Sequence, residues 1–253
     1  MKIQLVLFDL GSTLVYPKQA WPPVYVRAER ALAGSLSARG LPLDEEQAAQ
    51  LFQGFLKSYY AGQNQGVREY PMACALRDHL EGHGFHDLPD ALVRAALDDL
   101  YSVTQQNYAA EQDALPTLAA LSHEGYHLGL ISNTSDDQNV HTLVERDGFE
   151  AYLEWILTSA GFGIRKPDER IFRAALDHFR VPPQAAAMVG DTLGADILGA
   201  NRTGMYSIWI TRRVEPVPEH RPDIPPSSTI ARLEELPGLL HRLEGSQEPP
   251  AGD

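Results

Sequence analysis

Short apolar runs that end in small or polar residues recur along the chain and predict the strands of a buried sheet. The first run, at 3–8, leads directly into Asp-Leu-Gly-Ser-Thr, which is typical of a strand that enters a turn. Later runs of the same character lie at 127–132, 155–158, 187–190 and 206–211. Because continuous apolar runs are typical of strands covered on both faces, these segments indicate a parallel sheet.

Helical periodicity fills the intervals between those runs. Predicted helices cover 115–124, 136–147, 167–179 and 193–202, and the first two stop at Gly125 and Gly148. This alternation predicts an α/β fold, a Rossmann-like parallel sheet with helices on both faces. A proline-rich connection at 213–227 leads to a last predicted helix at 230–243.

One long stretch, 16–111, lacks a convincing strand and breaks the alternation. Its periodicity predicts helices at 24–36, 45–60, 71–80 and 89–108. We expect an all-helical domain at 16–111, inserted into a core of residues 1–15 and 112–245. Both of its connections leave from the carboxyl edge of the sheet, so the insertion should cover that edge, where open α/β sheets bind ligands. Residues 246–253 are expected to form a disordered tail.

Composition narrows the possible partners. The 253 residues carry 34 acidic and 21 Lys or Arg side chains, a net charge of -13. Such a surface repels nucleic acid and anionic membranes, while a small anionic substrate can still bind where the few cations gather. Cys74 is the single cysteine and the first apolar run is too short for a signal peptide, which predicts a soluble, cytoplasmic protein.

Polar residues that carry chemistry follow the predicted strands. If the sheet is parallel, its carboxyl edge gathers Asp9, Ser132, Asn133, Lys166, Asp191 and Asp196. Three converging carboxylates repel one another strongly, and a bound cation would relieve that repulsion. Because all the ligands on offer are hard oxygens, Mg²⁺ is the expected ion.

Four sequence motifs resemble those of the haloacid dehalogenase-like hydrolase superfamily in order and spacing. They are Phe-Asp9-Leu-Gly-Ser-Thr13-Leu, Leu-Ile-Ser132-Asn133, Arg-Lys166-Pro-Asp and Val-Gly-Asp191-Thr-Leu-Gly-Ala-Asp196. The inserted helical segment is similar to the type 1 cap of that superfamily. The resemblance implies a hydrolase, most simply a Mg²⁺-dependent phosphatase that acts on a small phosphorylated metabolite.

The resemblance also implies roles for individual residues. Asp9 would attack the substrate and form a covalent intermediate, and Lys166 would stabilise charge on Asp9 and on the phosphoryl group. Ser132 and Asn133, with Lys166, would bind the substrate. The metal site would consist of Asp9, the backbone carbonyl of Gly11, Asp191 and Asp196. Asp191 would ligate Mg²⁺ directly, and Asp196 would orient the ion or a water bound to it from outside the immediate ligands.

Gly11 departs from the phosphatase pattern. Phosphatases of the superfamily place a second Asp two residues after the nucleophile, as general acid and base, and its loss removes typically 10²- to 10⁴-fold in rate. Two alternatives therefore stay open. One is a metal-independent dehalogenase, although such enzymes typically have Tyr at this position. The other is a catalytically weak binding protein that keeps the fold.

Several of these residues also have structural explanations. Ser132 and Asn133 are possible caps for the following helix, and Asp191 and Asp196 suit a helix N-terminus. His79, His83 and His86 are expected in a solvated turn rather than a metal site. Trp21 and Tyr25, four residues apart, would either shape a substrate pocket or fill the core of the helical insertion.

Overall fold

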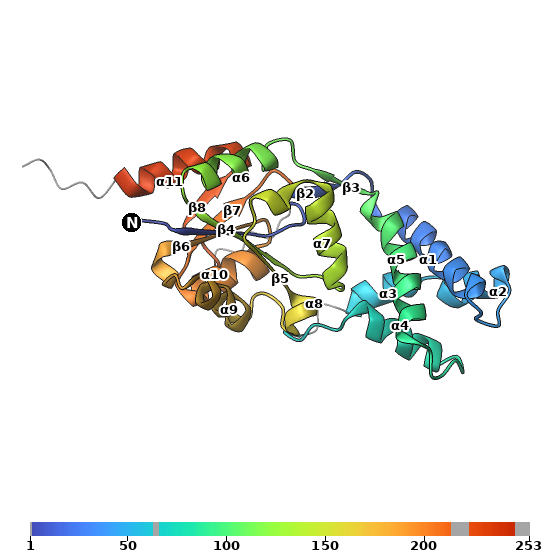
Figure 1. Ribbon diagram of the computed structural model, residues 1–253. Helices are drawn as coiled ribbons and strands as arrows, with labels where there is room; N and C mark the ends of the chain where they lie inside the picture. The colour runs from blue at the N-terminus through green and yellow to red at the C-terminus, as the bar shows by residue number, and fades with distance from the viewer. Residues whose placement is uncertain (1, 63–65, 214–222, 246–253) are drawn as a thin grey trace, which may run out of the picture.

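A parallel six-stranded sheet organises the computed structural model, which describes residues 2–62, 66–213 and 223–245 (Figure 1). The strands lie in the order β5 (Trp155–Thr158), β4 (His127–Ser132), β1 (Leu5–Phe8), β6 (Ala186–Gly190), β7 (Tyr206–Ile210) and β8 (Ser228–Ile230). All five neighbouring pairs are parallel. The α/β prediction is confirmed, and Asp9 lies directly after the central strand β1.

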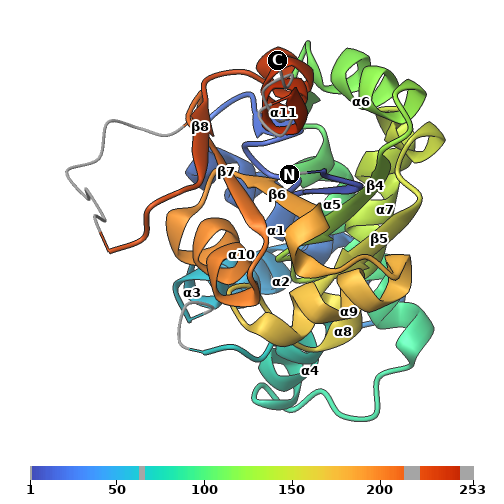
Figure 2. The same ribbon diagram turned by 90° about the vertical axis from the view of Figure 1, so that its left-hand side faces the viewer.

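Helices cover both faces of this sheet (Figure 2). On one face, Val6 and Phe8 pack against α6 (Ala114–His123), α7 (Asp137–Arg146) and α11 (Leu236–Gly245). On the other, Leu5 and Leu7 pack against α9 (Glu169–Phe179) and α10 (Leu198–Thr203). Successive side chains of a strand point to opposite faces, so one four-residue apolar run supplies both cores.

Five helices form a separate apolar cluster beside the sheet, and we call these helices, with the described segments that connect them, the helical region. They are α1 (Trp21–Ala38), α2 (Glu45–Phe52), α3 (Phe55–Gly62), α4 (Met72–Glu81) and α5 (Asp90–Gln105). Leu32, Phe52, Leu76 and Leu97 are among the buried side chains of their shared core. The chain enters and leaves through an antiparallel ribbon of β2 (Val15–Pro17) and β3 (Tyr108–Ala110).

Some predicted elements differ from the observed ones. The helix expected at 45–60 is interrupted after Phe52, where Gly54 adopts a φ of 78° that the α-helix does not permit. The ribbon strands β2 and β3 were not predicted. The last helix begins at Leu236 because residues 228–230 join the sheet as β8. The predicted tail at 246–253 and most of the 213–227 connection lie outside the described residues.

The remaining elements are short. They are α8 (Ser159–Phe162), a π-helix at Leu193–Ile197 that continues into α10, and 3₁₀ helices at Phe149–Ala151, Pro183–Ala185 and Leu233–Glu235. None of the helices in the described chain combines the length and apolar character that a membrane span requires.

The packing of α10 against α9 depends on a glycine. A Cβ at Gly199 would lie 2.1 Å from the Phe172 ring, so we expect Gly199→Ala to lower the free energy of unfolding by about 1–3 kcal/mol through overpacking. A Cβ built at Gly34 in α1 would have no heavy atom within 4 Å. Gly34→Ala should therefore raise the free energy of unfolding by about 0.5–1 kcal/mol. Urea unfolding measures both, and a destabilised Gly34→Ala would contradict the explanation.

Candidate active site

Lys166 lies at the centre of a buried polar cluster at the carboxyl edge of the sheet. Its Nζ donates hydrogen bonds to Oδ1 of Asp9 at 2.6 Å and to the carbonyl of Ile131 at 2.7 Å, and it lies 2.7 Å from Oδ1 of Asp196. The side chain is only 2% exposed. A buried ammonium is tolerated because these three oxygens replace its water.

Asn133 fixes the backbone at Lys166. Its side-chain oxygen accepts a hydrogen bond from the Lys166 N–H at 2.8 Å, and its amide nitrogen donates to the Lys166 carbonyl at 3.0 Å. The N-cap of α7 is Asp136, so neither Ser132 nor Asn133 caps that helix. Substrate binding by Asn133 stays a prediction. Its side chain holds the backbone of Lys166 through these two hydrogen bonds.

Three carboxylates converge beside this lysine. Asp9, Asp191 and Asp196 each offer an oxygen within 4.8 Å of the others. The backbone N–H of Thr192 donates to Oδ2 of Asp196 at 3.0 Å, and the Trp209 indole donates to the backbone carbonyl of Asp191 at 2.8 Å. The turn after β6, which carries Asp191, is therefore stabilised by a hydrogen bond to Asp196 and by one from the neighbouring strand β7.

Gly190 lets Asp196 approach the end of β6. A Cβ at this position would lie 2.3 Å from the Asp196 carboxyl carbon, so any larger residue would displace the carboxylate. Gly190 immediately precedes Asp191, and the local sequence Gly-Asp therefore combines a ligand with the space for its partner.

Burial and mutual repulsion shift the protonation of the cluster. Burial raises the pKa of Asp9 to about 6, opposed by the Lys166 charge and reinforced by Asp196. Burial raises the pKa of Asp191 to about 7, with the charges of Asp9 and Asp196 adding to the effect. Burial alone would disfavour the ammonium of Lys166, but Asp196 and Asp9 outweigh it and raise its pKa. The cluster thus carries more negative charge than one cation can neutralise.

The donor set fits a divalent metal ion. It consists of hard carboxylate oxygens, and the buried Oδ1 of Asp196 has Lys166 Nζ, at 2.7 Å, as its one partner among the described residues. Asp9, Asp191 and Asp196 could hold such an ion. Gly11 lines the same cavity and has a backbone carbonyl to offer.

The predicted site residues share one cavity of about 530 Å³. Its wall includes every member of the predicted set: Asp9, Gly11, Ser132, Asn133, Lys166, Asp191 and Asp196. Ser12, Arg165 and Gly66 also line it. Gly66 belongs to the segment between α3 and α4, so part of the wall comes from the helical region.

Glu69 ties the helical region to the loop that precedes Lys166. Its carboxylate accepts hydrogen bonds from Ser159 Oγ at 2.5 Å and from Arg165 Nη1 at 2.6 Å, and its side chain is fully buried. The Glu69 N–H donates to the Gly163 carbonyl and the Arg165 N–H donates to the Val67 carbonyl. The backbone just before Lys166 therefore forms an antiparallel bridge with the segment between α3 and α4, at Arg68 and Ile164.

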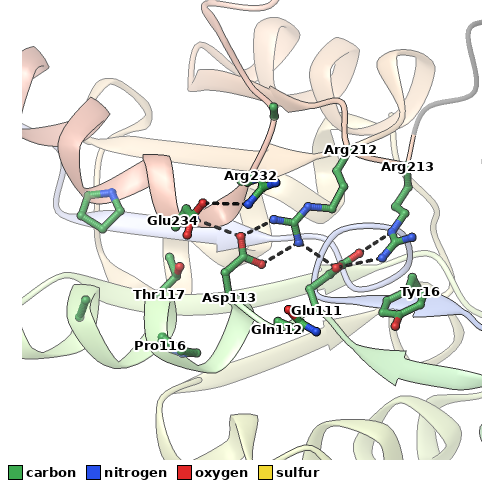
Figure 3. A pocket seen from close by; sticks show the side chains of 13 residues that line it. Tyr16, Glu111, Gln112, Asp113, Pro116, Thr117, Arg212, Arg213, Arg232 and Glu234 are labelled. Atoms are coloured by element: carbon green, nitrogen blue, oxygen red, sulfur yellow. Dashed lines mark hydrogen bonds and ion pairs between the residues drawn. The ribbon is translucent and has the colours of Figure 1, made fainter.

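A larger, shallower cavity of about 760 Å³ lies beside the β2–β3 ribbon (Figure 3). Arg212 forms ion pairs with Glu111 and Asp113, and Arg213 pairs with Glu111 while lying 3.8 Å above the Tyr16 ring. All these charges are already paired with one another. We therefore interpret this network as an anchor for the ribbon, and the smaller cavity around Asp9 as the active site.

Several important residues were not predicted. Glu69 lies in a polar segment with no motif, and Trp209 lies inside an apolar strand run that gives no sign of its contact with Asp191. The histidines form no metal cluster within the described chain: His79 bonds the Leu51 carbonyl and His83 bonds the His79 carbonyl.

The fold and the motifs match one family over most of the chain. The family profile described as haloacid dehalogenase-like hydrolase covers residues 3–204. The chain belongs to this family of hydrolases. This confirms the resemblance seen in the motifs.

Individual relatives match 80–97% of the chain. "Haloacid dehalogenase-like hydrolase domain-containing protein 3" of Bos taurus is 28% identical and covers 97% of both chains. "Ribulose-1,5-bisphosphate 5-phosphatase" of Halopiger xanaduensis is 30% identical over 80% of this chain and 82% of its own. The solved 2-haloacid dehalogenase of Pseudomonas syringae has a TM-score of 0.65 at 27% identity, covering 95% of this chain and 99% of its own.

The raised carboxyl pKa values predict a pH-dependent response to a divalent ion. Asp9 and Asp191 hold protons more tightly when folded than at their ordinary pKa of 3.8, so without metal their contribution to stability falls as the pH rises from about 4 through 7. A metal ion competes with those protons. We expect Mg²⁺ to raise the Tm more at about pH 8 than at about pH 5.

Differential scanning fluorimetry with MgCl₂, against NaCl of equal ionic strength, measures this difference. Asp191→Asn should reduce the Mg²⁺-induced shift at the higher pH because it removes one anionic ligand. An equal shift at both pH values would contradict metal binding by these carboxylates.

Proposed function

We propose that this family member is a Mg²⁺-dependent phosphatase that acts on a small phosphorylated metabolite through a covalent aspartyl-phosphate at Asp9. The observation that carries the proposal is the cluster of Asp9, Asp191 and Asp196 within 4.8 Å around one buried lysine. An anionic nucleophile reaches an anionic phosphoryl group only if nearby cations neutralise the approach. Lys166 supplies one positive charge, and the carboxylates are suited to hold a second.

The contacts of Asp9 suggest how the attack proceeds. Lys166 holds Oδ1 of Asp9 at 2.6 Å, which leaves the other carboxylate oxygen to attack phosphorus. As the Asp9 O–P bond forms, the bond from phosphorus to the alcohol oxygen breaks, and water later hydrolyses the acyl phosphate. Ser132 and Lys166 would donate hydrogen bonds to the transferring oxygens. Mg²⁺, held by Asp9, Asp191, Asp196 and the Gly11 carbonyl, would supply charge neutralisation.

The helical region is proposed to act as the cap of this site, with domain boundaries at 16–111. Gly66 lines the active-site cavity, and Glu69 pairs with the loop before Lys166. Both contacts bring the helical region over the carboxyl edge. Closure of such a cap excludes water and completes the catalytic arrangement.

Relatives named as phosphatases support this assignment of substrate class. The protein of Halopiger xanaduensis carries a phosphatase name and matches at 30% identity over most of both chains. By its name it acts on a small phosphorylated sugar. A small phosphorylated metabolite is the corresponding proposal for this chain.

Dehalogenation is the second candidate because a solved 2-haloacid dehalogenase matches at a TM-score of 0.65. The carboxylate cluster favours the phosphatase, since carbon–halogen hydrolysis needs no group of metal ligands. Halide release from a 2-haloacid that continues in the presence of EDTA would favour dehalogenation over our proposal.

Asp9→Asn should abolish turnover of para-nitrophenyl phosphate, because the amide is a poor nucleophile and removes a metal ligand. We expect wild-type turnover to require Mg²⁺ and to stop with EDTA. Asp168→Asn is a matched control, because Asp168 caps α9 outside the cavity, and it should keep most of the activity. Absorbance of nitrophenolate measures the rate. Turnover by Asp9→Asn equal to that of the wild type would contradict the proposed nucleophile.

Gly11→Asp should raise the hydrolysis of alkyl phosphates by about 10²- to 10⁴-fold, because it supplies an acid for the departing alcohol. No heavy atom lies within 4 Å of a Cβ built at Gly11, so the new side chain has space. The rate with para-nitrophenyl phosphate should change much less, because nitrophenolate leaves without protonation.

Gly11→Asn is the matched control, similar in size and without an acid. Phosphate release from glycerol phosphate compares the three proteins. An increase with Gly11→Asn equal to that with Gly11→Asp would exclude general acid catalysis as the cause.

A further inference from the structure

A further, smaller cavity, which we call the aromatic cavity, is lined by residues of the helical region, of β3 and of α7. Its volume is about 180 Å³. Aromatic rings form most of its wall: Trp21, Tyr25, Tyr60, Tyr101 and Tyr108. Thr104 from α5 and Asn139 from α7 complete it. Trp21 and Tyr25, singled out in the sequence, therefore line a cavity rather than only filling a core.

Mutual ring contacts hold this wall in place. Trp21 stacks on Tyr25 with ring centroids 5.7 Å apart, and Tyr25 stacks on Tyr60 at 5.4 Å. Tyr108 meets Trp21 edge to face at 5.2 Å. Rings that brace one another lose little freedom when a ligand binds, and their faces favour a ligand that is itself a ring.

The wall of the aromatic cavity carries no charged side chain among the described residues that line it. A carboxylate or second phosphate buried there would lose its water without gaining a cation. The hydroxyls of Tyr25 and Tyr108 form no hydrogen bond within the described chain. They are available to an uncharged polar group.

Two chain segments connect the aromatic cavity to the active-site cavity. Tyr108 lies in β3, which pairs with β2, and Val15 at the start of β2 forms a bridge with Gly11 of the active-site cavity. Tyr101 also bonds Ser135 at 3.0 Å, three residues after Ser132 of the active-site cavity. A substrate whose phosphate binds at Asp9 can therefore extend toward the aromatic rings.

The size of the aromatic cavity limits what it accepts. An apolar protein cavity of about 150 Å³ holds one benzene molecule. At about 180 Å³, the aromatic cavity suits a single six-membered ring. The phosphoryl group would remain in the larger cavity that contains Asp9.

We infer that the aromatic cavity receives the leaving group, so that the preferred substrates are phosphate monoesters of uncharged, single-ring alcohols. This inference rests on the proposed phosphatase function and adds the class of substrate. A ring alcohol of the phenol type also suits Gly11, because a phenolate is a better leaving group than an alkoxide and depends less on a general acid. A sugar ring offers the same stacking face, with hydroxyls for Tyr25 and Tyr108.

Substrate pairs with matched leaving groups test the inference. Para-carbamoylphenyl phosphate should have a higher kcat/KM than para-carboxyphenyl phosphate, which has nearly the same shape and adds a negative charge. Phenyl phosphate should have a higher kcat/KM than naphthyl phosphate, which adds a second ring. For sugars, glucose 6-phosphate should have a higher kcat/KM than sorbitol 6-phosphate, which has an open chain in place of the ring. Equal or higher kcat/KM for the charged, two-ring and open-chain members would overturn the inference.

Trp21→Leu should raise the KM for phenyl phosphate by about 2- to 10-fold, the range expected for a lost aromatic contact. Turnover of acetyl phosphate, which has no ring, should stay within about twofold by the same reasoning. Trp155→Leu is the matched control, because Trp155 stacks on His178 and does not line the aromatic cavity. It should change neither the KM for phenyl phosphate nor the turnover of acetyl phosphate. If Trp21→Leu fails to fold, Tyr25→Leu replaces it.

Calorimetric binding of phenylphosphonate and methylphosphonate separates this inference from the proposed function. Preference for phenylphosphonate that Trp21→Leu removes would support the aromatic cavity even in a protein without turnover. Hydrolysis of acetyl phosphate with no such preference would leave the phosphatase proposal standing and overturn the aromatic cavity as a leaving-group site.

Discussion

The buried ammonium of Lys166 is the interaction on which the rest of the site depends. It contacts Asp9 after β1, the Ile131 carbonyl in β4 and Asp196 after β6, and these three strands are neighbours in the sheet. Removing the cation would leave buried carboxylates without their partner, a costly arrangement. The parallel sheet matters because it brings these three chain segments to one edge.

The position of Lys166 depends in turn on the helical region. Asn133 grips its backbone from the sheet side, while Glu69 holds Arg165, the preceding residue, from the other side. Movement of the helical region away from the sheet would break the Glu69 contacts and release the loop that carries the cation. Arg213 meanwhile contacts Tyr16 in β2 and pairs with Glu111, the residue that directly follows β3. The geometry of the polar cluster and the position of the helical region are therefore linked through these contacts.

The sequence predicted the parts of this arrangement that leave a local pattern. Apolar runs located five strands, and the strand ends located Asp9, Lys166 and Asp191, because side chains at one edge of a parallel sheet follow their strands in sequence. Strand β8 has three residues, too few for a periodic signal. Glu69 and Ser159 are 90 residues apart, and Trp209 meets Asp191 across neighbouring strands. Such contacts depend on the assembled fold and leave no local trace.

Under the proposed phosphatase function, Gly11 and the aromatic cavity would together constrain the substrate. A glycine at this position would leave the departing oxygen without a protein acid, so the alcohol itself would have to be a good leaving group or accept a proton from water. The carboxylate released from an acyl phosphate is also a good leaving group. Where that group carries a second negative charge, however, the uncharged wall of the aromatic cavity disfavours it. Phenol-like alcohols meet both conditions, whereas a sugar ring meets only the second unless phosphate is attached at its anomeric oxygen. Among the ring alcohols that fit the aromatic cavity, the missing general acid at Gly11 thus favours those that are good leaving groups.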